Sequence, residues 1–142
     1  MAEAVTLQDV GLEVKRLQWR HHREANTRLG AIGLSLPQWD VLRHLHASPE
    51  ASLHRLAVLT FQTDQSMGAL AARMIDRGLL ERVDGPGRAV RHRPTSAGEK
   101  LRREGSGLMN GVLGESLGHL SDAELSTLHA LLVKAAAGKS AD

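Results

Sequence analysis

Apolar residues recur at helical spacing along the first part of the chain. Between residues 6 and 29 they stand mostly three or four positions apart, which predicts one long amphipathic helix. Two glycines, Gly30 and Gly33, predict where this helix ends. A second helix is expected to begin after Ser35, which can cap it while Gln38, three positions on, completes a capping box.

Two shorter helices are predicted next, with a tight turn between them. The stretch 47–52 contains proline and small polar residues and interrupts the second helix, whereas the leucines of residues 53–59 predict a third. Around Thr63 the chain turns again. A fourth helix is expected to run from there to Arg77, with Gly78 as its C-terminal stop.

The apolar pattern changes after the fourth helix. The stretches LLERVD and AVRHRP are short, contain β-branched residues, and flank the glycine-rich segment GPGR. This arrangement predicts a β-hairpin, because glycine permits positive φ at a tight tip. Thr95 is then expected to cap a fifth helix running to about Leu120, and the complete capping box SDAE at residues 121–124 predicts a last helix.

The predicted order is four helices, a hairpin and two helices. We therefore expect a mainly α fold with a small β-hairpin wing, in which residues 35–95 form a winged helix-turn-helix DNA-binding domain. Residues 1–34 and 96–142 are expected to form a helical dimerisation region, since their apolar stripes exceed what one small helix-turn-helix can cover.

Composition narrows the class of protein. Hydrophobic residues make up 42% and charged residues 24% of the 142, which is typical of a globular chain and not of a disordered one. Cysteine is absent, which excludes disulfides, thiolate redox sensing and cysteine zinc sites. The sequence has neither a membrane-length apolar run nor a secretory signal, so we expect a cytoplasmic protein without a membrane partner.

Basic charge is concentrated around the predicted hairpin. Residues 82–103 hold seven arginines and lysines against two acidic residues, a balance of +5, whereas the rest of the chain holds 11 against 14, a balance of −3. A basic block on a mildly acidic body indicates a polyanionic partner. The alternative is that a surface turn simply collects basic side chains.

Three motifs, in this order and spacing, resemble the MarR family of bacterial transcription regulators. They are GLSLPQWDVLRHL at 33–45, RMIDRGLLER at 73–82, and RPTSAGEKL at 93–101, which is similar to the family's start of the dimerisation helix. The resemblance covers nearly the whole chain. It implies a homodimer that binds a pseudo-palindromic operator, and we expect a repressor. The wing departs from the family pattern, because DGPGR is shorter than DxxDxR and lacks the second acid that braces the wing-tip arginine.

By this resemblance the fourth helix enters the major groove of double-stranded DNA. Glutamine can bond an adenine edge at two points, serine can read a base or bond a phosphate, and arginine pairs well with phosphate oxygens. Capping alone is an equally good account of Thr63. The expected DNA-binding residues are Thr63, Asp64, Gln65, Ser66, Gly68, Ala69, Arg73, Arg88, Arg91 and Arg93.

The resemblance also implies a small-molecule effector, often an anionic aromatic compound, bound between the dimerisation helices and the DNA-binding domain. The candidate lining residues are Trp19, His22, Trp39 and Arg43. Trp39 and Arg43 are four positions apart and share a helix face, where an indole can stack and a guanidinium can meet a carboxylate. The alternative is that both tryptophans belong to the ordinary core.

Four glycines of the predicted fifth helix, Gly107, Gly111, Gly114 and Gly118, fall on one stripe. Each destabilises a helix interior by roughly 1 kcal/mol relative to alanine, so a stripe of them predicts that something lies close to the backbone there. That neighbour is either a helix at a dimer seam or a small ligand. The alternative is a helix broken near Gly111.

Catalytic and metal-binding patterns are missing from the sequence. It has no GxSxG, no phosphate-binding loop and no HExxH, and its eight histidines form no pair with ligand spacing. We therefore expect a non-enzyme without metal or cofactor. Two alternatives to a ligand-controlled regulator stay open, namely a ligand-independent nucleoid or architectural protein on the same fold, and a winged-helix module that binds protein. The basic block argues against the second.

Overall fold

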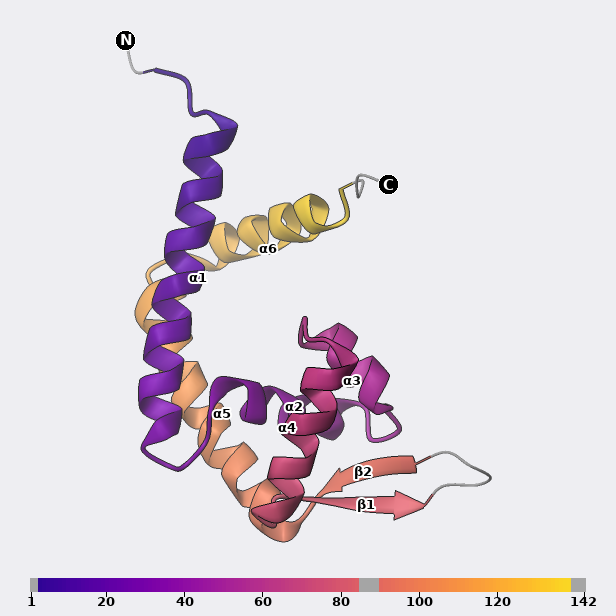
Figure 1. Cartoon of the computed structure of the whole chain (residues 1–142). Helices are drawn as coiled ribbons and strands as arrows, with labels where there is room; N and C mark the ends of the chain where they lie inside the picture. The colour runs from indigo at the N-terminus through magenta and orange to yellow at the C-terminus, as the bar shows by residue number, and fades with distance from the viewer. Residues whose placement is uncertain (1–2, 85–89, 139–142) are drawn as a thin grey trace.

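The computed structural model describes residues 3–84 and 90–138 (Figure 1). Its elements in chain order are α1 (Leu7–Gly30), α2 (Leu36–Ala47), α3 (Leu53–Leu59), α4 (Asp64–Asp76), β1 (Leu80–Asp84), β2 (Val90–Pro94), α5 (Ser96–Leu117) and α6 (Asp122–Ala136). This order confirms the predicted fold class. None of the helices in the described part of the chain is long and apolar enough to cross a membrane.

Every helix in these two ranges begins on a serine or threonine whose side-chain oxygen accepts a hydrogen bond from the backbone N–H three positions on. The caps are Thr6, Ser35, Ser52, Thr63, Thr95 and Ser121. Such a cap stabilises a helix by about 1 kcal/mol relative to alanine. The boxes predicted at Ser35 and Ser121 are both formed, so local sequence sets most helix starts.

Three helix ends close with the same pair of backbone hydrogen bonds around one residue in the left-handed conformation. That residue is Gly33 after α1, Phe61 after α3 and Gly78 after α4, with φ values of 80°, 58° and 73°. Glycine adopts this conformation freely, whereas another residue is destabilised by about 1–2 kcal/mol. The two glycines were predicted as stops, and the phenylalanine was not.

The core lies where α2, α3, α4 and the hairpin meet the C-terminal end of α1 and the first half of α5. Its largest fully buried side chains are Val41, Leu42, Leu45, Leu56, Met67, Met74, Leu80 and Leu29. Trp39 packs against this cluster from α2 and is 7% exposed. With aromatic residues at only 2% of the chain, aliphatic side chains fill the interior.

The two strands form an antiparallel hairpin in which Leu80 pairs with Pro94 and Asp84 with Val90. β1 packs against α4 and β2 against α2, which attaches the wing to the helix-turn-helix. His92, opposite Arg82 in the register, is the buried polar residue among those described. The predicted wing-tip residue Arg88 lies outside the described residues.

The long helices α1 and α5 lie against each other, while α6 leaves the end of α5 at a steep angle and projects from the body (Figure 1). No residue of α6 is buried, and the first half of α1 is exposed as well. The large hydrophobic side chains exposed on these two helices are Leu7, Val10, Leu12, Val14, Trp19, Leu125, Leu131, Leu132 and Val133. A single chain thus leaves a broad apolar surface uncovered on both helices.

The glycines of α5 correct two sequence-based expectations. The helix is continuous through Gly111 and ends at Leu117, three residues before the predicted end, so it is not broken. Within the described chain no atom comes within 4 Å of a Cβ built at Gly107. A Cβ at Gly114 would likewise meet nothing within 4 Å, whereas one at Gly111 would lie 3.2 Å from the Arg28 guanidinium of α1, so the predicted close neighbour exists at one position of the stripe. Tighter approaches occur outside the stripe, at Gly98, where a Cβ would overlap a backbone carbonyl, and at Gly105, where it would overlap the indole of α2.

Candidate nucleic-acid interface and ligand cavity

The predicted DNA-binding residues at the start of α4 have different roles: Thr63 caps the helix, and Gln65 presents an exposed side chain. The Thr63 hydroxyl accepts from the backbone N–H of Ser66 at 3.0 Å and donates to the Ser66 Oγ at 3.0 Å. Thr63 is therefore fully used as a cap. Gln65 is exposed, and its amide makes no hydrogen bond to any residue that the structure describes. Thr63, Asp64 and Ser66 each make a side-chain hydrogen bond within the described chain, so Gln65 is the one predicted polar residue of this turn whose side chain makes none there.

Asp64 faces α3 and is paired there. Its Oδ1 lies 2.9 Å from Nδ1 of His54, and both side chains are largely exposed. A carboxylate in the first turn interacts favourably with the helix dipole, but it also places negative charge beside the residues expected to meet DNA. Asp64 therefore belongs to the predicted surface by position, while its negative charge opposes phosphate.

One face of α4 gathers the remaining predicted residues. Gln65, Ala69 and Arg73 are four positions apart, so they line up along the helix, and all three are exposed. The opposite face, with Met67 and Met74 among its residues, is buried in the core. Gly68 is half-buried, and a Cβ built on it would meet no atom within 4 Å. We call Gln65, Ala69 and Arg73 the α4 face.

Arg91 and Arg93, the two described arginines that were predicted to bind DNA from the wing, both contact carboxylates. Nε of Arg93 lies 2.5 Å from Oε1 of Glu81 across the hairpin, and Nε of Arg91 lies 3.8 Å from Glu50 in the loop after α2. Because these pairs are largely exposed, each contributes little to stability and can exchange its partner for a phosphate. Arg82, which sequence analysis passed over as a site residue, is exposed on β1 within the same basic block.

A cavity of about 980 Å³ lies between α1, α2, α5 and α6, and its surface is mostly apolar. Three of the four predicted ligand residues, His22, Trp39 and Arg43, line it. Trp19 does not line it: this tryptophan is 58% exposed and stacks on His22 with ring centroids 6.0 Å apart.

Trp39 and Arg43, two of the residues with which α2 lines the cavity, are arranged as their spacing predicted. The guanidinium carbon of Arg43 lies 5.1 Å from the centroid of the Trp39 ring, and Arg43 also bonds Asp40 at 3.0 Å. Nε1 of Trp39 donates to the backbone carbonyl of Arg102 at 3.3 Å, which fixes the indole between core and cavity. Trp39 is thus a core residue and a lining residue at once, so neither of the two sequence-based interpretations excludes the other.

Sequence analysis missed the histidines that line the cavity from other helices. His21 lies on α1 and His129 on α6, and both contribute to the lining. Nε2 of His21 lies 2.6 Å from Oγ of Ser116 on α5. Burial lowers the pKa of His21, and the positive charge of Arg20 lowers it further. His22 was predicted to line the cavity, and its neighbour His21 could have been considered with it.

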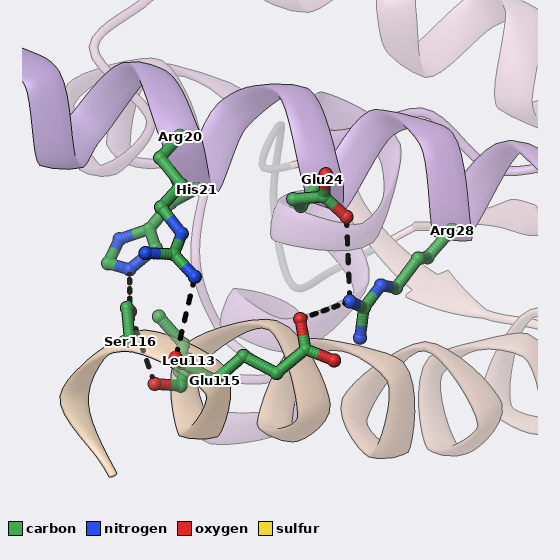
Figure 2. A network of polar contacts seen from close by, with 7 residues as sticks. All are labelled: Arg20, His21, Glu24, Arg28, Leu113, Glu115 and Ser116. Carbon is green, nitrogen blue, oxygen red and sulfur yellow. Dashed lines mark hydrogen bonds and ion pairs between the residues drawn. The ribbon is translucent and has the colours of Figure 1, made fainter. Parts of the chain in front are cut away.

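Polar contacts between α1 and α5 continue beyond His21 (Figure 2). The Arg28 guanidinium bridges Glu24 on its own helix and Glu115 on α5, and Arg20 donates to the Glu115 carbonyl at 3.4 Å. These contacts hold the two long helices in one alignment along the cavity wall. We call Arg20, Glu24, Arg28 and Glu115 the α1–α5 clamp.

Comparison with known proteins finds one matching family model and several solved structures of similar fold. The sequence profile of the MarR family matches residues 32–89, and no curated protein sequence matches the chain. Among solved structures, CouR from Rhodococcus jostii bound to p-coumaroyl-CoA is 19% identical over 98% of this chain and 100% of its own, with a TM-score of 0.84.

Two further structures share the fold. A mutant MarR from E. coli complexed with operator DNA is 19% identical over 89% of this chain and 92% of its own, with a TM-score of 0.79. A MarR family protein of Mycobacterium tuberculosis in complex with salicylic acid is 24% identical over 94% of this chain and 98% of its own, with a TM-score of 0.72.

The MarR family consists of transcription regulators and not of enzymes. The matched segment contains the whole helix-turn-helix and β1, and the structural likeness extends over α1, α5 and α6. Residues 32–89 thus match the MarR family model, and nearly the whole chain has the fold of MarR family proteins.

Proposed function

We propose that this protein is a homodimeric transcriptional regulator that represses by binding a pseudo-palindromic operator and is released by a small anionic aromatic compound. The observation that carries the proposal is the α4 face, where Gln65, Ala69 and Arg73 lie exposed in a row on the second helix of a MarR family helix-turn-helix. An exposed row of this kind fits a helix that enters the major groove.

The residues of the α4 face would contribute to DNA binding in different ways, some to specificity and some to affinity. The free amide of Gln65 suits a two-point contact with adenine, and the small side chain of Ala69 permits close approach to the groove floor. Arg73, two turns further on, suits a phosphate. Arg91 and Arg93 of β2 would exchange their carboxylate partners for phosphates beside the wing, and Arg88 is proposed for the tip.

Dimerisation is supported by the apolar surface that one chain leaves uncovered. Leu7 is 92% exposed and Leu131 57% exposed, and α6 contributes no buried residue to its own chain. Soluble monomers rarely leave contiguous surfaces of this kind to solvent. A second copy that covers α1 and α6 would bury them and set the spacing between two recognition helices, as a two-fold operator requires.

The cavity supports a small effector. Its apolar walls suit an aromatic ring, the Trp39 indole offers a stacking surface, and the Arg43 guanidinium beside it suits a carboxylate. The structures of similar fold were solved with salicylic acid in one case and p-coumaroyl-CoA in another. We therefore propose a carboxylated aromatic compound of salicylate size or larger.

Ligand and DNA would be coupled through α2. This helix lines the cavity with Trp39 and Arg43, and it also packs against α3 and β2. A ligand that binds better to one position of α2 shifts the population toward that position and moves the helix-turn-helix relative to α1 and α5. The two recognition helices of a dimer would then no longer match the spacing of two half-sites.

The test is competition between DNA and ligand. The protein is titrated onto a duplex of the DNA upstream of its own coding sequence and onto a random duplex of equal length, each with and without salicylate. We expect tighter binding to the upstream duplex and weakening by salicylate that disappears in Arg43→Ala. Equal affinity for both duplexes would contradict specific regulation. If the protein binds the upstream duplex specifically but no aromatic acid weakens that binding, the proposed DNA-binding function stands and the proposed effector is wrong.

A further inference from the structure

Phe61 is the single phenylalanine of the chain, and the core does not use it. Its side chain is 97% exposed in the turn between α3 and α4. Its φ is 58°, the sole positive value at a non-glycine position among the described residues. A large aromatic ring is normally buried, and a non-glycine residue normally avoids the left-handed region. Phe61 therefore departs from two preferences at once.

The other two helix ends with these hydrogen bonds show which residue type this backbone conformation favours. The N–H of Gln62 bonds the carbonyl of Ala57 at 2.9 Å, and the N–H of Phe61 bonds the carbonyl of Val58 at 3.3 Å. The same two bonds close α1 around Gly33 and α4 around Gly78. Two of three equivalent positions thus hold glycine. Since the third gains neither burial nor a relaxed backbone from its ring, the fold gives no reason for a phenylalanine there.

The turn that carries the ring comes directly before the α4 face in the chain and is fixed by hydrogen bonds. Phe61 stands two residues before the cap Thr63 and four before Gln65. The Thr60 hydroxyl donates to the Leu56 carbonyl at 2.7 Å and accepts from the Gln62 amide at 3.3 Å, which fixes the turn on both sides. The turn is therefore ordered, and the exposed ring adjoins the end of α4 that carries Gln65.

We propose that Phe61 is a DNA-contacting residue whose ring packs against apolar atoms at the edge of the groove that α4 enters. This inference rests on the proposed DNA-binding function. A phenyl ring forms no hydrogen bond with phosphate, so its partners on a duplex are deoxyribose carbons or the methyl group of thymine. Continuity with the α4 face favours DNA over a protein partner, because any surface that covers Gln65 in a groove lies next to position 61.

The proposal makes stability and DNA affinity change in opposite directions. Phe61→Gly removes the backbone strain and the ring together, so we expect the thermal midpoint to rise by about 3–6 °C and DNA affinity to fall about tenfold. The dependence of affinity on salt should stay unchanged, because no phosphate contact is lost. Phe61→Leu keeps an apolar side chain and the strain, so it should retain most of the affinity without the gain in stability.

A matched control measures the backbone contribution by itself. A Cβ at Gly78 would meet no atom within 4 Å, so Gly78→Ala introduces left-handed strain without a clash. We expect its thermal midpoint to fall by about as much as that of Phe61→Gly rises, with DNA affinity unchanged. Thymine replaced by deoxyuridine in the duplex then separates the two apolar partners. Loss of wild-type affinity on that duplex identifies the thymine methyl group, and unchanged affinity identifies deoxyribose.

Three results would overturn the inference. If Phe61→Gly lowers the thermal midpoint, the ring stabilises the fold and needs no partner. If the variant is stabilised but binds DNA as tightly as the wild type, the ring serves something other than DNA, such as a protein partner. In both cases the proposed function survives, because the wild-type protein still binds DNA. If the wild-type protein binds neither duplex, the proposed function and this inference fail together.

Discussion

At the scale of single residues, Gln65 and Arg73 of the α4 face are predicted to contribute differently to DNA binding, Gln65 to specificity and Arg73 to affinity. Gln65→Ala removes an uncharged two-point contact, so we expect discrimination between operator and random DNA to fall by about 1–3 kcal/mol, with the salt dependence unchanged. Arg73→Ala should weaken both DNAs alike and flatten the salt dependence. Titrations of both variants on both DNAs at several salt concentrations measure this. Equal weakening of the two DNAs by Gln65→Ala would show that Gln65 reads no base.

A second prediction at this scale concerns His92, a buried residue of β2 in the wing. Burial lowers the pKa of His92, and the charge of Arg82 lowers it further, so the folded state disfavours the protonated form. The unfolded state then binds more protons, and stability falls as the pH drops below about 6.5. Urea unfolding of wild type and His92→Gln between pH 7.5 and 5.5 tests this. A variant whose unfolding free energy falls as steeply as that of the wild type would contradict the assignment.

At the scale of elements, the starts of the helices could be predicted from the sequence, whereas the close packing between helices could not. Capping residues such as Ser35 and Ser121 act within three positions, so the local sequence contains all the information needed. The tightly packed glycines of α5 are fixed by partners far along the chain, because Gly98 meets the backbone of Leu79, just before β1, and Gly105 meets Trp39 of α2. The exclusion of Trp19 from the cavity depends on the packing of α1 against α5, which helical spacing on α1 cannot reveal.

Alanine substitutions at two glycines of α5 are predicted to change the stability of the fold in opposite directions. A Cβ at Gly105 would overlap the Trp39 ring in a packed region, so Gly105→Ala should destabilise the fold by about 1–3 kcal/mol. A Cβ at Gly107, two positions on in the same helix, would meet no atom within 4 Å, so helix propensity alone predicts a gain of about 1 kcal/mol from Gly107→Ala. Denaturant unfolding compares the two. A loss at Gly107 would indicate that a second chain packs on it.

At the scale of the whole molecule, the uncovered faces of α1 and α6 predict association. Leu131→Glu and Leu7→Glu introduce charge at exposed positions, so neither should harm the fold of one chain. In a dimer they would be buried, and both variants should shift the mass measured by light scattering from two chains toward one. DNA affinity should fall with the dimer. If the wild-type protein stays monomeric at micromolar concentration, the proposed homodimer is wrong.

The most direct test of the central claim is a hydroxyl-radical footprint of the wild-type protein on its own upstream DNA. The account predicts two protected half-sites of related sequence on a pseudo-palindrome, spaced so that both face the same side of the duplex, with protection lost when salicylate is added. Uniform protection of any sequence, or none at protein concentrations that saturate a gel shift, would contradict a sequence-specific regulator.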